Sequence, residues 1–131
     1  MKDNYIYPAI FSYEDDGISI SFPDLEGCFT CAKDDEEAYL SSKEVLGLYM
    51  VSLEEEKKEI PKATCLKDIV LKENERSQLV SVWMPRVRKA IENKAVKKTL
   101  SIPQWLDVKA REEDLNFSYI LQQALKKELG V

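Results

Sequence analysis

The last third of the chain places a short alternating segment in front of two short amphipathic helical patterns. Residues 96–103 alternate polar and apolar side chains after a basic start, and the two helical patterns meet at Leu115 and Asn116. A piece of about 40 to 50 residues rarely buries enough apolar surface to fold alone. A lone strand also leaves both of its edges unpaired. These residues therefore predict a module that folds by pairing with a second copy of itself.

The predicted strand over residues 96–102 has two different faces, because successive side chains of a strand point to opposite sides. Its polar face carries Lys97, Thr99 and Ser101. Its apolar face carries Val96, Leu100 and Ile102, and Lys98 shares that side near the open end. One face can therefore contact a ligand while the other face is buried.

Two helices are predicted after this strand. Pro103 suits the first turn of the first helix, which runs to about residue 114. Asn116 suits the cap of the second helix, and Gly130 suits its end. Apolar residues recur in the second helix at helical spacing: Phe117, Ile120, Leu121, Ala124, Leu125 and Leu129. The expected dimer core consists of Leu100, Ile102, Trp105, Ile120, Leu121, Ala124 and Leu125, with Leu106 and Ala110 also facing inward.

Charge divides the chain into an acidic and a basic part. Residues 1–80 hold 18 acidic and 9 basic side chains, a net charge of −9, whereas residues 81–131 hold 6 and 10, a net charge of +4. The basic excess gathers in Arg86, Arg88, Lys89, Lys94, Lys97 and Lys98, opposed there only by Glu92. Such a segment can supply phosphate contacts to DNA. The alternative is a solvated basic helix turn that links two domains, over residues 86–95.

The first 85 residues predict a small α+β domain with the element order β, β, β, α, β. Strands over residues 5–13 and 18–22 form a hairpin around an Asp-Gly turn. Pro8 cannot donate to a sheet, so it belongs at a strand start, a bulge or an edge. Short third and fourth strands are expected over residues 28–32 and 78–83, and residues 62–76 form a loop with at most one helical turn.

A helix between the third and fourth strands is well marked. Asp34 can cap it, and Glu37 lies three residues later in the capping-box position. The helix should end within residues 54–59, before Pro61. Its predicted apolar side consists of Ala38, Val45, Leu46, Tyr49, Met50 and Leu53.

Residues that could carry catalysis are few, and their spacing favours structural roles. Cys28 and Cys31 form a C-x-x-C, but there is no second pair and no histidine, and three cysteines do not suggest a disulfide framework. Two buried or half-buried thiols are the expectation for this pair. The acids Asp15, Asp16, Asp24, Asp34 and Asp35 fit turns and a cap. We therefore expect no enzyme activity, no metal and no cofactor.

The chain also has no long apolar run and no signal-peptide core at its N-terminus. This pattern predicts a soluble, cytoplasmic protein without a membrane segment.

Several motifs resemble HicB-type antitoxins. They are Phe22-Pro-Asp-Leu-Glu-Gly-Cys28, then Thr30, then Asp34-Asp-Glu-Glu-Ala38 at a helix start, and Tyr7-Pro-Ala9 in the first strand. The sequence departs from the family at Ala32, where glycine is common, and at Glu26, where proline is frequent. The resemblance implies a degraded RNase H-like N-terminal domain without nuclease residues, and a C-terminal DNA-binding domain. The implied partner is HicA, a small ribonuclease that cleaves mRNA.

The resemblance and the C-terminal pattern together predict a ribbon-helix-helix, in which strands from two chains pair and enter the major groove of operator DNA. The implied DNA contacts are Lys97, Thr99 and Ser101 for base edges, Asn116, Phe117 and Ser118 for a phosphate, and Lys94 and Lys98 nearby. The expected domains are residues 1–85 for toxin binding, 86–95 as a basic linker and 96–131 for dimerisation and DNA binding.

Toxin capture is assigned to the acidic domain, which can cover the basic RNA-binding surface of a ribonuclease. The candidate contacts are Asp15, Asp16, Asp24, Leu25 and Glu26, although each also fits a plain turn residue. Three alternatives remain open at this point. They are a dimer that binds no DNA, a stand-alone regulator whose N-terminal domain binds another ligand, and an active RNase H-like nuclease with clustered carboxylates.

Overall fold

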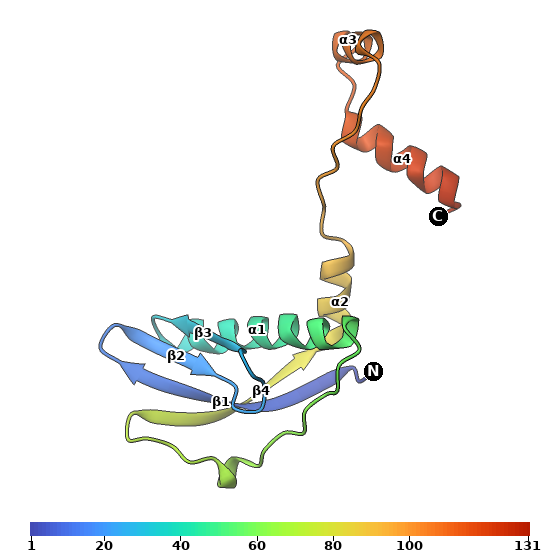
Figure 1. Cartoon of the computed structure of the whole chain (residues 1–131). Helices are drawn as coiled ribbons and strands as arrows, with labels where there is room; N and C mark the ends of the chain where they lie inside the picture. Colours follow the sequence, from blue (N-terminus) through green and yellow to red (C-terminus); the bar gives the residue numbers. More distant parts are fainter. The chain divides into compact units, whose positions relative to one another are not determined.

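The computed structural model describes all residues from 1 to 131 and forms two compact units, Met1–Lys94 and Ala95–Val131. Unit 1 contains a four-stranded antiparallel sheet with the strand order β3-β2-β1-β4. The strands are β1 (Asn4–Glu14), β2 (Gly17–Ser21), β3 (Phe29–Ala32) and β4 (Glu75–Trp83). Helix α1 (Asp35–Glu55) covers one face of this sheet (Figure 1). The predicted order β, β, β, α, β is confirmed.

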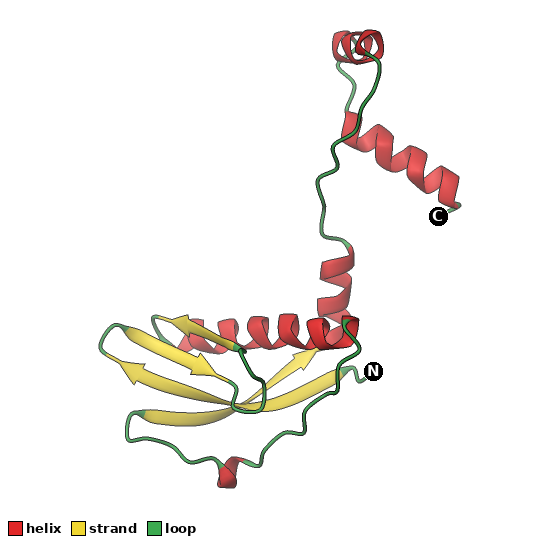
Figure 2. Ribbon diagram, viewed as in Figure 1, coloured by secondary structure: helices red, strands yellow, loops and turns green.

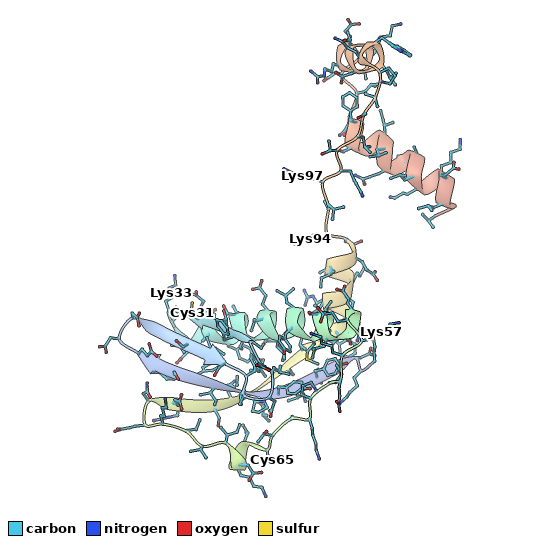
Figure 3. The ribbon with its side chains drawn as sticks, in the orientation of Figure 1. Cys31, Lys33, Lys57, Cys65, Lys94 and Lys97 are labelled. Carbon is cyan, nitrogen blue, oxygen red and sulfur yellow. The ribbon has the colours of Figure 1, made fainter.

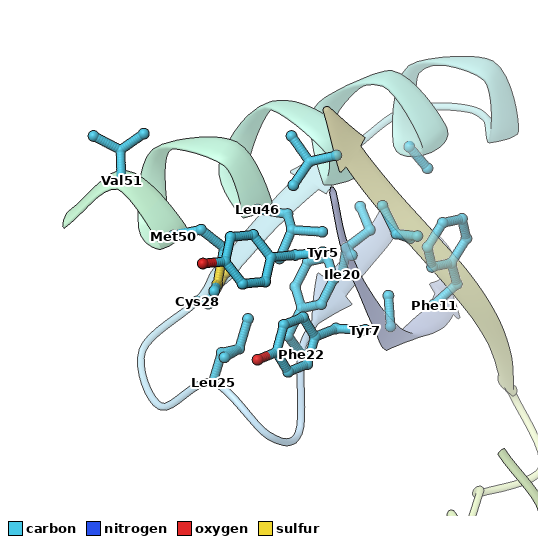
Figure 4. Close-up of a cluster of buried hydrophobic side chains, with 14 of the residues drawn as sticks. Tyr5, Tyr7, Phe11, Ile20, Phe22, Leu25, Cys28, Leu46, Met50 and Val51 are labelled. Atoms are coloured by element: carbon cyan, nitrogen blue, oxygen red, sulfur yellow. The ribbon is translucent and has the colours of Figure 1, made fainter. Parts of the chain in front are cut away.

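The core of unit 1 lies between α1 and the covered face of the sheet. Tyr5, Tyr7, Ala9 and Phe11 alternate along β1 and are all buried. They meet Leu46 and Met50 of α1, among other side chains of the cluster in Figure 4. Full burial of one such apolar side chain contributes about 1.5 to 3 kcal/mol. The period of two in β1 therefore determines which face of the sheet packs against the helix.

Pro8 lies within β1, where only one neighbouring strand is present. β2 pairs with β1 only from Ile10 to Glu14, whereas β4 pairs with it from Asn4 to Ser12. Pro8 is opposite Leu79 of β4 and has no β2 residue on its other side. The expectation of a locally unpaired position is confirmed, since proline has no N–H to donate to a second neighbour.

The turn between β1 and β2 depends on Gly17. This residue has a φ of +145°, and a Cβ built on it would lie 2.7 Å from the carbonyl oxygen of Ala32 in β3. Any larger residue would therefore clash with backbone of the neighbouring region. Asp15 and Asp16 complete the turn at the exposed tip of this hairpin.

Both ends of α1 agree with the expectation from the sequence. The Asp34 side chain accepts a hydrogen bond of 2.8 Å from the Glu37 backbone amide, which satisfies one of the free donors at the helix start. The helix ends at Glu55, inside the predicted range. A single 3-10 turn, Leu66–Asp68, interrupts the loop that follows, as expected.

β4 begins three residues earlier than predicted, at Glu75 rather than at residue 78. The Tyr13 backbone amide donates a 2.9 Å hydrogen bond to the carbonyl of Asn74, and the Ser12 hydroxyl donates a 2.8 Å bond to the Glu75 carboxylate. These contacts with β1 extend the strand into a charged stretch whose local sequence does not favour it.

The segment expected as a basic linker is largely helical. Helix α2 (Met84–Glu92) follows β4 directly, and unit 1 extends as far as Lys94. Met84 is fully buried, and Val87 and Ile91 pack against the core of unit 1. The linker assignment for residues 86–95 is thus corrected, because three apolar side chains hold this stretch on the domain.

Unit 2 contains two helices, α3 (Gln104–Glu112) and α4 (Phe117–Leu129) (Figure 2). The Asn116 side chain accepts a 3.0 Å hydrogen bond from the Tyr119 amide, and Gly130 ends α4 with a φ of +74°. Both predicted caps of the second helix are confirmed. Pro103 stands one position before the first helix, as its N-cap residue, rather than within its first turn.

Residues 94–103 form no strand in the single chain. A strand needs a hydrogen-bonded neighbour, and neither helix of unit 2 can supply one. The expected neighbour is the same segment of a second copy, so this strand stays a prediction about the dimer.

Candidate interaction sites

Unit 2 exposes nearly all of its apolar side chains. Among its residues only Ala110 is buried, and Leu121 is half-buried. The other residues assigned to a dimer core are exposed: Leu100, Ile102, Trp105, Ile120, Ala124 and Leu125, with Trp105 at 65%. These side chains are therefore not buried against their own chain. Of the residues expected to face inward from the first helix, Trp105 and Leu106 are exposed and only Ala110 is buried.

The residues expected to read DNA bases lie before α3 in the chain. Lys97, Thr99 and Ser101 are exposed, as are Lys94 and Lys98. Figure 3 labels Lys94 after the end of α2 and Lys97 three residues further along the chain. None of the three lysines takes part in an ion pair. Their charges remain available to an anionic partner.

The predicted phosphate contacts form the start of α4. Asn116, Phe117 and Ser118 are exposed, with Phe117 at 46%. The first turn carries no acidic side chain that would oppose an anion. A helix start of this kind attracts negative charge through its free amides and dipole.

The five toxin-contact candidates fall into two separate places. Asp15 and Asp16 are exposed between β1 and β2, whereas Asp24, Leu25 and Glu26 follow the other end of β2. Leu25 is only 1% exposed and points into the core in Figure 4, so its assignment as an accessible contact is wrong. The acidic neighbours Asp24 and Glu26 suggest an exposed loop, but the Leu25 side chain between them belongs to the core.

The loop that holds Asp24 is tied down by hydrogen bonds. The Asp24 carboxylate accepts bonds from the backbone amide of Thr64, at 2.9 Å, and from its hydroxyl. The Tyr49 hydroxyl donates a 2.8 Å bond to the backbone carbonyl of Glu26. Asp24 thus joins two loops of unit 1, and Glu26 keeps its exposed side chain free.

Further carboxylates surround Asp15 and Asp16. A hollow of about 450 Å³ beside the hairpin is lined by Glu14, Asp15, Asp16, Lys33, Asp34 and Asp35, among others. The Tyr13 hydroxyl donates a 2.6 Å hydrogen bond to Asp35, and this bond raises the pKa of Tyr13. The sequence offers Asp34 and Asp35, with Asp15 and Asp16, as carboxylates of a possible nuclease site, and the structure brings these four residues to one hollow.

A polar network that the sequence does not reveal anchors α2. Arg88 donates to both carboxylate oxygens of Glu54, from Nε at 3.0 Å and from Nη2 at 2.6 Å. The Tyr5 hydroxyl donates to the same carboxylate at 3.0 Å. The bonds from Arg88 lower the pKa of Glu54, and burial raises the pKa of Tyr5. These three residues are far apart in sequence, so no local pattern indicates their meeting.

The cysteines differ in environment. Cys28 is buried, and this burial raises the pKa of its thiol to about 11. Cys31 and Cys65 are exposed, so the expectation of a buried or half-buried thiol is right for Cys28 and wrong for Cys31. No three side chains among His, Cys, Asp and Glu are grouped to hold a metal ion. None of the helices is both long and apolar enough to cross a membrane.

Comparisons with known proteins cover most of the chain. Residues 7–124 match the family model "HicB_like antitoxin of bacterial toxin-antitoxin system". A chain of a toxin-antitoxin complex from Streptococcus pneumoniae is 28% identical, with a TM-score of 0.62 over 95% of this chain and 99% of that one. A chain of the "HicA3 and HicB3 toxin-antitoxin complex" is 23% identical, with a TM-score of 0.50 over 60% of this chain and 98% of that one.

One curated relative gives a partial match. An uncharacterized 14.9 kDa protein of Haemophilus phage HP1 is 27% identical over 77 residues, which span 59% of this chain and 58% of the relative. The family model, by contrast, covers both units, including the four-stranded sheet, α1, α2 and α3 and most of α4. The chain therefore belongs to the HicB-like antitoxins of bacterial toxin-antitoxin systems.

Proposed function

We propose that this antitoxin inhibits a HicA-like, mRNA-cleaving ribonuclease by direct binding through unit 1, and represses its own operon through a dimer of unit 2. The observation that carries the proposal is the division of labour between the units. Unit 1 has a closed core and an acidic surface, whereas unit 2 has exposed apolar side chains and a basic segment before it. Each unit thus needs a different kind of partner.

Inhibition is assigned to unit 1 because of its charge. Residues 1–94 hold 19 acidic and 13 basic side chains, a net charge of −6, and 18 of these acids lie within residues 1–83. A ribonuclease presents a basic surface to RNA, and an acidic domain that covers this surface competes with the substrate. The relatives found in toxin-antitoxin complexes support a HicA-type partner. Asp15, Asp16 and Glu26 are the accessible candidates for this contact, and a degraded RNase H-like fold is the proposed frame.

Operator binding is assigned to unit 2 because its exposed apolar side chains can be buried by pairing with a second copy, which forms the dimer proposed to bind DNA. In the proposed ribbon-helix-helix, residues 96–102 of two chains pair as antiparallel strands. Leu100 and Ile102 then enter a shared core with both copies of α4, while Lys97, Thr99 and Ser101 face the major groove. The start of α4, at Asn116, Phe117 and Ser118, holds a backbone phosphate. Lys94 and Lys98 add salt-dependent affinity.

Inhibition is tested with the toxin encoded beside this antitoxin. We expect mRNA cleavage to stop when the antitoxin reaches stoichiometric amounts, and gel filtration to show one complex. The test variant replaces Asp15 and Asp16 with lysine, which should weaken inhibition of the toxin. Its unfolding temperature should stay unchanged, since both side chains are exposed. Persistent cleavage at excess wild-type antitoxin would refute the inhibitory role.

A further inference from the structure

Helix α2 has an inward and an outward face. Met84, Val87, Arg88 and Ile91 follow the spacing i, i+3, i+4 and i+7, and all are buried or half-buried against unit 1. Gly47 permits this close packing, because a Cβ at that position would lie only 3.1 Å from the Val87 side chain. α2 is therefore fixed on unit 1 in one rotation about its axis.

The inward face also removes one arginine from the basic segment. Arg88 is held by both oxygens of Glu54 and donates a 2.7 Å hydrogen bond to the carbonyl of Lys2. Only 23% of its side chain is exposed. Arg88 thus stabilises unit 1 and is unavailable to an external anion.

The outward face presents the remaining charges of the helix. Arg86 and Lys89 are three residues apart, so they share one side of α2, and both are exposed. Neither takes part in an ion pair, and Asn93 follows on the same side. Glu92, the single acid of α2, is exposed three residues after Lys89 and adjoins the same side, so Arg86, Lys89 and Glu92 together carry a net charge of +1. This positive face lies on a unit whose net charge is negative.

Chain connectivity limits how far α2 can lie from DNA. Lys94 precedes Lys97 by three residues, a separation of at most about 11 Å in extended chain. The major groove is about 12 Å wide, so its phosphate borders lie within that reach of a residue that contacts bases. This limit holds for any arrangement of the two units. When residues 97–101 occupy the groove, Lys94 is within reach of the flanking backbone. Lys89 and Arg86 lie about 5 and 9 Å further back along α2, measured from Glu92 at about 1.5 Å per residue.

We propose that the outward face of α2, through Arg86 and Lys89, binds the phosphate backbone of the operator next to the base-reading strand. The inference rests on the proposed operator binding and adds a contact surface that belongs to unit 1. It also gives the face an electrostatic role. The acidic residues 1–83 would be repelled by DNA, and a cationic helix between them and the duplex offsets this repulsion.

The test measures how affinity for DNA depends on salt. Footprinting of the Arg86→Gln/Lys89→Gln variant on the duplex upstream of the antitoxin gene defines a protected core that excludes the phosphates assigned to α2. Binding is then measured on that core alone and on the core with about one helical turn, about 10 base pairs, added at each end. For Arg86→Gln/Lys89→Gln on the long duplex, the slope of log K against log salt should fall by up to about 3.6, for four lost contacts at about 0.9 each in a dimer.

Two controls make the result specific. Lys62→Gln/Lys67→Gln removes the same charge from exposed positions in the loop before β4, and its slope should equal that of the wild type. Lys97→Ala should relax discrimination between operator and scrambled sequence, whereas Arg86→Gln/Lys89→Gln should preserve it. On the trimmed core duplex the effect of the α2 variant should shrink.

Three outcomes would overturn the inference. If the α2 variant has the wild-type salt slope on the long duplex, Arg86 and Lys89 do not contact phosphates. Operator binding by unit 2 would be unaffected by that result. An equal loss on both duplexes places the contacts inside the core rather than beside it. Failure of the wild-type protein to bind the upstream duplex refutes operator binding and the α2 contact together.

Discussion

At the scale of single residues, the ion pair between Glu54 and Arg88 is the most enclosed charge interaction of unit 1. The Glu54 side chain is 6% exposed and also accepts a hydrogen bond from Tyr5. Asp3, by contrast, meets Arg88 at 3.5 Å with 63% of its side chain exposed. Exposed pairs contribute little, whereas removal of one partner from an enclosed pair leaves the other charge unpaired.

We therefore predict that Glu54→Gln lowers the free energy of unfolding by about 1 to 3 kcal/mol at pH 7. The pKa of Glu54 is lowered in the folded state, so its stabilisation is present above its unfolded pKa of about 4.3 and is lost as pH falls through the folded value. Urea unfolding from pH 7 down to pH 3 should show the two proteins converging in acid. A difference that stays constant over this range would contradict the prediction. Asp3→Asn serves as the exposed control.

At the scale of elements, the local signals predicted most of unit 1. The period of two in β1, the cap at Asp34 and the helical spacing in α1 act within a few residues, and each was confirmed. For α2 the sequence indicates only a solvated basic helix turn, because its apolar residues are interrupted by three cations. The packing of this helix on unit 1 depends on Gly47 and Glu54, which are far away in sequence. Leu25 was misplaced for a similar reason, since only the fold shows that its loop closes over the core.

The contact between α1 and α2 makes Gly47 a sharp test of element packing. Alanine is favoured over glycine in a helix by about 1 kcal/mol. A Cβ at position 47 would, however, lie 3.2 Å from Val82 and 3.1 Å from Val87, and such overpacking costs about 1 to 3 kcal/mol. We predict that Gly47→Ala destabilises the wild-type protein by up to about 2 kcal/mol, measured by thermal unfolding.

The same substitution should behave differently once Val87 is shortened. Val87→Ala removes the two Val87 methyl groups near position 47 and leaves the Val82 methyl at 3.2 Å, so Gly47→Ala should cost less in that background. A double-mutant cycle measures the coupling between the two positions. Equal effects of Gly47→Ala in both backgrounds would show that α2 does not pack tightly on Gly47.

At the scale of the whole molecule, the DNA-binding candidates follow from a clearer sequence pattern than the toxin-binding candidates. Lys97, Thr99 and Ser101 follow from a simple alternation, and the structure keeps them exposed. The acids of unit 1 carry no such pattern, because turns and protein contacts use the same residue types. The predicted strand over residues 18–22 already separates Asp15 from Asp24, but only the fold shows that Asp24 is engaged by Thr64.

The exposed apolar residues of unit 2 imply that its stability depends on protein concentration. If two copies bury Ile120 and its neighbours in one core, unfolding of unit 2 is coupled to dissociation, and its unfolding temperature rises with concentration. Ile120→Asp should convert the dimer to a monomer in sedimentation, while Gln123→Asp, on the polar side of α4, should not. Unit 1 keeps its own core and should bind toxin in either state. The single chain leaves 46% of Ile120 exposed. A wild-type protein that sediments as a monomer at all concentrations would therefore contradict a core shared between two copies.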